Sequence, residues 1–176
     1  MDEPLSSLDA KLRESLRVEL KNIQTNLNAT ILYVTHDQAE ATTLADKIGV
    51  LKEGHLVQIG TPEEIYENPN SIYVSQRLGS PKINILPGTL LGMNDVPTFG
   101  IRPENITIGN GNHSAKIISI ENLGSETVVA LNFKDQEILV SIQGNYKSSI
   151  NETINFDINN KKVLKFDQEG NRIYER

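Results

Sequence analysis

The sequence contains no cysteine and no tryptophan. Without cysteine, the chain can form neither disulfides nor thiolate metal sites, which fits a reducing compartment such as the cytoplasm. Aromatic residues make up only 5% of the chain, which leaves little surface for stacking on nucleic-acid bases. The three histidines, His36, His55 and His113, are too far apart in the sequence to indicate a metal site by their spacing.

The chain also lacks long apolar runs and an excess of basic residues. No stretch approaches the roughly 18 apolar residues of a membrane span, and the first residues do not show the pattern of a secretory signal. The net charge is −6, with seven basic and twelve acidic residues in 1–78 and ten and eleven in 79–176. Because neither part is basic, we expect no nucleic-acid partner. Because no long apolar run occurs, we expect no direct membrane span.

The first part of the chain alternates helix and strand signals. Apolar residues recur every three or four positions from Leu12 to Leu27, which predicts an amphipathic helix with Ser6, Ser7 or Asp9 as its N-cap. The elements expected after it are a buried parallel strand at 30–35, a helix at 37–46, a hairpin of 48–51 with 56–59, and a helix that starts at Thr61-Pro62. The strands are too few for a complete α/β sheet.

From residue 79 onward the pattern changes to short alternating strands separated by glycine and asparagine. Strands are expected at 98–102, 115–121, 127–133, 138–142, 154–158 and 163–166, with turns at 109–112, 122–124 and 144–145. The four phenylalanines are expected in the core. The sequence therefore predicts a partial α/β layer over residues 1–78, followed by a small all-β barrel over residues 79–176.

Asp2, Glu3 and His36 are weak signals one by one, but the segments around them form a pattern. Residues 2–10 (DEPLSSLDA), the helix, the strand and residues 35–41 (THDQAEA) resemble the Walker B end, D-loop and H-loop of ABC-transporter nucleotide-binding subunits. Later segments are similar to the importer branch for sugars and glycerol phosphate: 44–46 (LAD), 51–54 (LKEG), 58–62 (QIGTP), 79–81 (GSP) and 100–104 (GIRPE). The resemblance is strong over residues 2–84 and looser to residue 176.

The resemblance implies a partial P-loop NTPase layer and a role for specific side chains around Mg-ATP. Asp2 would help to hold Mg²⁺, usually through water, and Glu3 would orient the attacking water. His36 corresponds to the switch histidine near the γ-phosphate. The residues that correspond to the D-loop, which faces the partner's ATP site, are Ser7, Leu8 and Asp9.

The chain departs from the family in the motifs that bind phosphate. The 176 residues contain no G-x-x-x-x-G-K-[ST] sequence, no LSGGQ-type signature and no Q-loop. We therefore interpret the chain as a fragment that does not hold ATP by itself. Three explanations of the fragment remain open: a truncated form, a decayed gene, or one piece of a split gene.

The second part resembles the OB-like regulatory (TOBE-type) barrel of these importers. The resemblance implies a homodimer or a second ATPase subunit, transmembrane permease subunits, an external solute-binding protein, and a cytoplasmic position at the inner face of the membrane. Two alternatives are a non-catalytic regulatory or scaffold protein that acts through the barrel, and an oligonucleotide-binding module, which the charge disfavours. The transported solute cannot be read from this chain, because the permease and binding protein select it.

Overall fold

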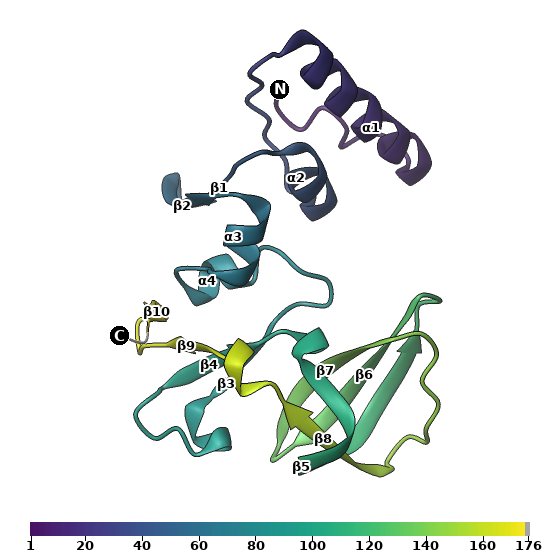
Figure 1. The fold of residues 1–176 in the computed structure, drawn as a ribbon, viewed down its shortest axis with the longest axis vertical. Coiled ribbons are helices and arrows are strands. Elements are labelled where there is room, and N and C mark those ends of the chain that lie inside the picture. Colours follow the sequence, from purple (N-terminus) through teal and green to yellow (C-terminus); the bar gives the residue numbers. More distant parts are fainter. Residues whose placement is uncertain (175–176) are drawn as a thin grey trace. The chain divides into compact units, whose positions relative to one another are not determined.

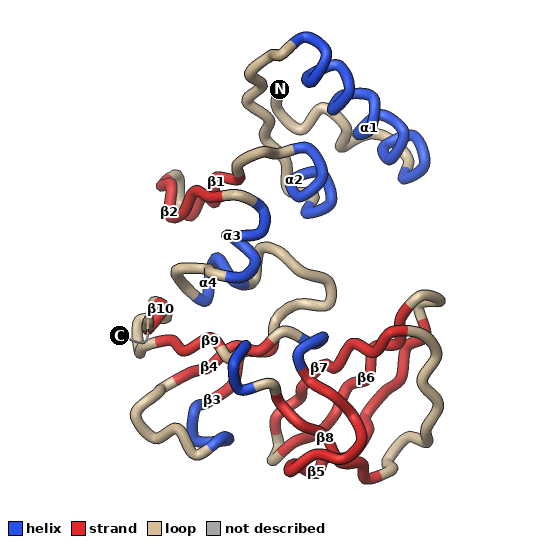
Figure 2. Tube along the Cα trace, viewed as in Figure 1, coloured by secondary structure: helices blue, strands red, loops and turns tan. Residues whose placement is uncertain are grey.

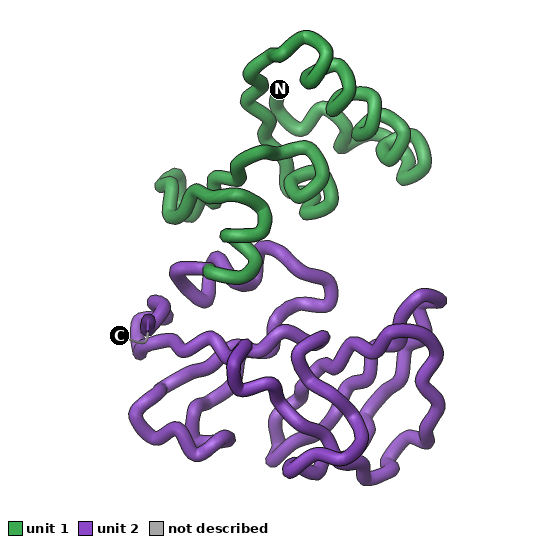
Figure 3. Tube along the Cα trace, in the orientation of Figure 1, with its two compact units in different colours: residues 1–68 green, residues 69–176 purple. Residues whose placement is uncertain are grey.

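The structure is a computed structural model that describes residues 1–174. It divides into two compact units, residues 1–68 and 69–176, which Figure 3 shows in separate colours. The second unit begins before residue 79 because residues 70–78 are bonded within it. The buried Arg102 guanidinium donates to the carbonyls of Ser75 and Leu78 at 3.1 and 2.6 Å. The division of the family's domains at 78 and 79 remains a prediction.

The first unit consists of three helices and one hairpin (Figures 1 and 2). Its elements are α1 (Ala10–Leu27), α2 (Gln38–Leu44), β1 (Ile48–Lys52), β2 (His55–Gly60) and α3 (Pro62–Glu67). Strands β1 and β2 pair antiparallel. The expected order of helices and hairpin is therefore confirmed.

Each helix of this unit starts at a side chain that accepts hydrogen bonds from its first turn. Asp9 caps α1, Asp37 caps α2, and Thr61 forms a capping box with Glu64 on α3. These caps satisfy backbone N–H groups that have no partner within the helix. The caps were readable from the sequence because the residues involved are local.

The parallel strand expected at residues 30–35 is not formed. This segment runs as a loop whose ladder contact is a single parallel bridge between Asp2 and Val34. A strand needs hydrogen-bonding neighbours along its length. Among the described residues, only residues 1–3 lie beside this segment. The one sheet of the first unit in the described part of the chain is the antiparallel hairpin. The α/β layer is therefore not present as a parallel sheet.

The second unit is mostly β (Figure 2). Its helical elements are α4 (Ile72–Ser75) and three short 3₁₀ turns at Gly88–Leu91, Pro103–Asn105 and Asn160–Lys162. Its strands are β3 (Asn84–Pro87), β4 (Thr98–Ile101), β5 (Ile106–Asn122), β6 (Glu126–Phe133), β7 (Gln136–Gln143), β8 (Thr153–Ile158), β9 (Leu164–Phe166) and β10 (Arg172–Ile173).

These strands form two four-stranded antiparallel sheets, in the orders β10-β9-β4-β3 and β7-β6-β5-β8, and not one closed barrel. The side chain of Asn84 connects them. It accepts a hydrogen bond from the Leu139 N–H at 2.7 Å and donates to the carbonyls of Leu139 and Ile101 at 2.9 and 3.2 Å. A buried amide thus takes the place of a ladder between β3 and β7.

The glycines at 109 and 111 mark a bulge and not the turn that their sequence suggested. Ile108 and His113 both pair with Phe156, so residues 109–112 are extra residues inside the long strand β5. A Cβ atom on Gly111 would lie 1.9 Å from the carbonyl atoms of Phe156. Glycine is required there because the two backbones approach closely.

The two units differ in how much apolar surface they bury. Of the 23 buried apolar side chains in residues 1–174, only Leu5, Val50 and Ile65 belong to the first unit. Helix α1 has no buried residue, and Leu27 is 71% exposed. The four phenylalanines of the second unit are at most 3% exposed, which confirms their expected place in the core. Burial of apolar area is the main source of stability, so the second unit should be the more stable one.

Replacing Asn84 by alanine should destabilise the second unit by about 1–3 kcal/mol, because the buried amide of Asn84 is lost and the partly buried N–H of Leu139 loses its acceptor. Urea unfolding, followed through the NMR signals of β6 and β7, measures the change. Asn155 on β8 is exposed, and Asn155→Ala provides the matched control. Equal stability of the two variants would contradict the bridging role.

Amide hydrogen exchange should be slower in residues 79–174 than in residues 5–60, since the first unit buries little apolar area. We also expect the chain to dimerise or aggregate through the exposed apolar side chains of residues 5–60. Light scattering measures the association. A monomer whose two parts are equally protected would show that this account is wrong.

Candidate functional site

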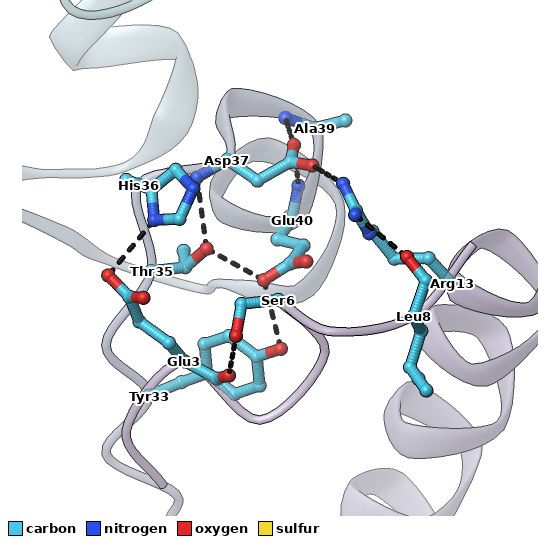
Figure 4. A network of polar contacts seen from close by, with 10 residues as sticks. All are labelled: Glu3, Ser6, Leu8, Arg13, Tyr33, Thr35, His36, Asp37, Ala39 and Glu40. Carbon is cyan, nitrogen blue, oxygen red and sulfur yellow. Dashed lines mark hydrogen bonds and ion pairs between the residues drawn. The ribbon is translucent and has the colours of Figure 1, made fainter. Parts of the chain in front are cut away.

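Two segments that are far apart in the sequence meet at the residues singled out above. The Glu3 N–H donates to the Val34 carbonyl and the Val34 N–H donates to the Met1 carbonyl, each at 2.9 Å. These bonds hold residues 1–3 beside residues 32–34. As a result, Glu3 and His36 lie close together although 33 positions separate them (Figure 4).

A tight turn follows Glu3 and leads into α1. Glu3 itself has a positive φ of 41°, a conformation that is uncommon for residues other than glycine. Its carbonyl accepts hydrogen bonds from the Ser6 N–H at 3.2 Å and the Ser6 hydroxyl at 2.9 Å. Leu5 is buried and anchors the turn. Residues 5–9 thereby reach the helix cap at Asp9.

Glu3 and His36 form the central contact of the site. His36 Nδ1 lies 2.9 Å from Glu3 Oε1, and the two side chains are 74% and 46% exposed. The hydrogen bond and the charge of Glu3 raise the pKa of His36 above its ordinary value of 6.5. A carboxylate and an imidazole that are both accessible and in contact can bind water and exchange a proton.

A buried carboxylate binds two residues that precede the histidine in the chain. Glu40 is 2% exposed, and its Oε2 accepts hydrogen bonds from the Thr35 hydroxyl at 2.7 Å and the Tyr33 hydroxyl at 3.0 Å. Burial and the bond to Glu40 raise the pKa of Tyr33 to about 12. The Thr35 hydroxyl also accepts a bond from the Asp37 N–H. The residues on both sides of His36 are thus fixed.

Asp37 connects the histidine to α1. Its Oδ1 accepts from the N–H groups of Ala39 and Glu40 at 2.7 and 3.2 Å, and its Oδ2 lies 3.1 Å from Arg13 Nη1. Partial burial opposes its ionisation, but the bonds from Glu40 and Ala39 and the ion pair with Arg13 hold the pKa of Asp37 below its usual value. Figure 4 shows these contacts together.

The remaining residues identified in the sequence lie near this network in different ways. Asp9 Oδ1 accepts from the Leu12 N–H at 3.0 Å, so its side chain caps α1. The Leu8 carbonyl accepts from Arg13 Nη2 at 3.0 Å. Ser7 and Asp2 are exposed. No cluster of three potential metal-ligating side chains occurs within residues 1–174, and the role of Asp2 toward Mg²⁺ remains a prediction.

Sequence reasoning missed the residues that hold the histidine in place: Arg13, Tyr33, Thr35 and Glu40. A recess is lined by several of them together with Glu3, Ser6, His36 and Asp37. Threonine two positions before an aspartate, at a helix start, is a local signal of such a turn. The contact between Arg13 and Asp37 spans 24 positions and has no local signal.

Comparison of the whole chain with known proteins identifies its family. Residues 99–160 match the TOBE domain family. The chain is 37% identical to the sn-glycerol-3-phosphate import ATP-binding protein UgpC of Psychromonas ingrahamii, over 99% of this chain and 54% of that protein. It is 38% identical to UgpC of Rhizobium meliloti, over 98% and 55%. The xylose/arabinose import ATP-binding protein XacK of Haloferax volcanii is 40% identical, over 77% and 42%.

The chain matches the C-terminal part of ABC-importer ATP-binding subunits. Within this family it falls with the sugar and glycerol-3-phosphate type, as the sequence motifs indicated. The chain spans about half the length of the curated relatives it matches. None of the helices in the described part of this ABC-importer chain is long and apolar enough to cross a membrane.

Replacing Glu3 by glutamine should lower the pKa of His36, because the imidazolium loses its charged acceptor. NMR titration of the three imidazoles measures this directly. The raised pKa means that the pair stabilises the fold below about pH 6.5, and that this contribution is lost as the pH rises through the pKa of the folded state. Glu14 is exposed on α1, and Glu14→Gln is the control. An unchanged pKa in the Glu3 variant would refute the contact.

Proposed function

We propose that this chain forms part of the ATP-hydrolysing subunit of an ABC importer for sugars or related small solutes. The contact between Glu3 and His36 carries the proposal, because it brings a carboxylate and an imidazole together at 2.9 Å on segments that resemble the Walker B end and the H-loop. The names of the relatives support the solute class: they are import ATP-binding proteins for glycerol 3-phosphate and for xylose and arabinose.

The side chains present fit one side of a Mg-ATP site. Glu3 and His36 are both accessible, and the recess beside them is lined mainly by polar groups. Glu3 would hold and polarise a water molecule, and His36 would donate a hydrogen bond from its ring. Asp2, one position before Glu3, would hold the metal through water. Mg-ATP supplies the phosphoryl group and its charge, and its phosphate cradle would come from residues outside these 176.

The proposal extends to the assembly. Ser7, Leu8 and Asp9 would face the ATP site of a second ATPase subunit, in a homodimer or a pair of related subunits. The subunit would bind transmembrane permease subunits at the inner face of the membrane, with an external binding protein that delivers the solute. Residues 1–78 would complete a P-loop NTPase layer with further strands. Residues 79–176 would act as an OB-like regulatory domain.

The test joins this chain to the N-terminal half of the Psychromonas relative and measures Mg-ATP hydrolysis. Glu3→Gln should lower turnover by about 10²–10⁴-fold while ATP binding persists, since the amide is a poorer hydrogen-bond acceptor for water. His36→Ala should have a similar effect, and Glu14→Gln should have none. Near-normal turnover in either of the first two variants would show that the roles are assigned wrongly.

A second candidate is a non-catalytic scaffold that acts through the β unit. It is favoured by the core, because 20 of the 23 buried apolar side chains described lie in that unit. The two candidates differ in what the first unit does when a phosphate cradle is supplied. The scaffold predicts that the joined protein binds ATP without hydrolysing it, whatever residue stands at position 3.

Calorimetry should detect no appreciable binding of Mg-ATP by the 176-residue chain alone. The reason is that the backbone N–H groups and lysine that hold the β- and γ-phosphates in such sites are missing from these residues. Micromolar affinity would contradict this expectation and would require a different phosphate site.

A further inference from the structure

The guanidinium of Arg13 lies between two segments of the site. Its Nη2 donates to the Leu8 carbonyl at 3.0 Å, and its Nη1 lies 3.1 Å from Asp37 Oδ2. Its side chain is 29% exposed and that of Asp37 is 23% exposed. Both contacts use one end of a planar group, whose two nitrogens have a fixed separation. The positions of Leu8 and Asp37 therefore depend on each other.

The contacts continue on the far side of Asp37. Its second oxygen accepts from the N–H groups of Ala39 and Glu40, so the carboxylate cannot follow Arg13 without moving the start of α2. His36 is the residue immediately before Asp37. A displacement of residues 5–9 would thus reach the histidine through one guanidinium and one carboxylate.

We propose that Arg13 is a positioning residue that couples residues 5–9 to His36. The inference rests on the proposed function for its meaning: under that proposal residues 7–9 face one nucleotide site and His36 faces the other. Arg13 then makes the placement of the switch histidine depend on the partner-facing turn. Without these two contacts of Arg13, the positions of residues 5–9 and of His36 would be independent of each other.

The test uses the full 176-residue chain and Arg13→Gln, with the pKa of His36 measured by NMR titration. The charged groups facing His36 are Glu3, Asp37 and Glu40. Removing the positive charge and leaving Asp37 unpaired would raise the pKa of His36 if only electrostatics were involved. Loss of positioning would instead separate His36 from Glu3 and lower the pKa toward 6.5. We expect the lower value, and a higher or unchanged value would overturn the proposal.

Lys11, an exposed residue in the first turn of α1, provides the control. Lys11→Gln removes the same charge from the same helix and should leave the pKa of His36 unchanged. Arg13→Lys guards against loss of fold in the glutamine variant, because lysine keeps the charge but has one nitrogen and cannot reproduce the two-pronged contact. It should also lower the pKa of His36. Wild-type behaviour of this lysine variant would contradict the proposal.

Coupling must also act in the reverse direction. Asp37→Asn keeps an oxygen that can cap α2 but removes the charge that holds Arg13. Amide exchange at residues 7–9 should become faster in this variant, and unchanged exchange would count against the coupling. None of these measurements uses nucleotide. They test the role of Arg13 alone, whereas unaltered ATP turnover in the Glu3 variant would reject the proposed function alone.

Discussion

The candidate site depends on two backbone hydrogen bonds that join residues 1–3 to Val34. They do for the first unit what a sheet does in a complete α/β domain, because they set two distant segments side by side with fixed spacing. The contact of Glu3 with His36 follows from that placement, whereas the cap at Asp9 and the bonds of Glu40 form within single segments. The chemistry proposed for this protein requires that these two side chains stay within hydrogen-bonding distance.

Different interactions stabilise each of the two units. The second unit has an apolar core that includes Phe99, Phe156 and Phe166, all fully buried. The site in the first unit relies on charged and polar contacts with partial exposure, such as the ion pair of Arg13 and Asp37. Salt screens such contacts, and a pH change that alters the charge of one partner weakens them. A packed apolar core is much less sensitive to both. The geometry of the site is therefore more sensitive to salt and pH than the packing of the second unit.

How far the sequence predicted the structure follows from the range of each interaction. Helix caps such as Asp9 and Thr61 were readable because donor and acceptor are a few positions apart. The strand at 30–35 was predicted from its β-branched residues, but pairing decides whether a strand forms, and among the described residues this segment has a single bridge, from Val34 to Asp2. The glycines of 109–112 indicated an irregular backbone correctly, yet only the pairing with Phe156 shows a bulge. The family motifs singled out Glu3 and His36 as candidates, and the structure places them in contact, while the contact of Arg13 with Asp37 could be found only in three dimensions.

The measurement that tests this account most directly is the ¹⁵N-resolved NMR spectrum of the His36 imidazole in the full chain near neutral pH. If Glu3 and His36 meet as described, Nδ1 carries a proton donated to the carboxylate, and the ring shows nuclear Overhauser contacts to the Glu3 methylene protons. A ring with an unprotonated Nδ1 and no contact to Glu3 would mean that the two segments do not meet. The proposed catalytic pair would then have no structural basis.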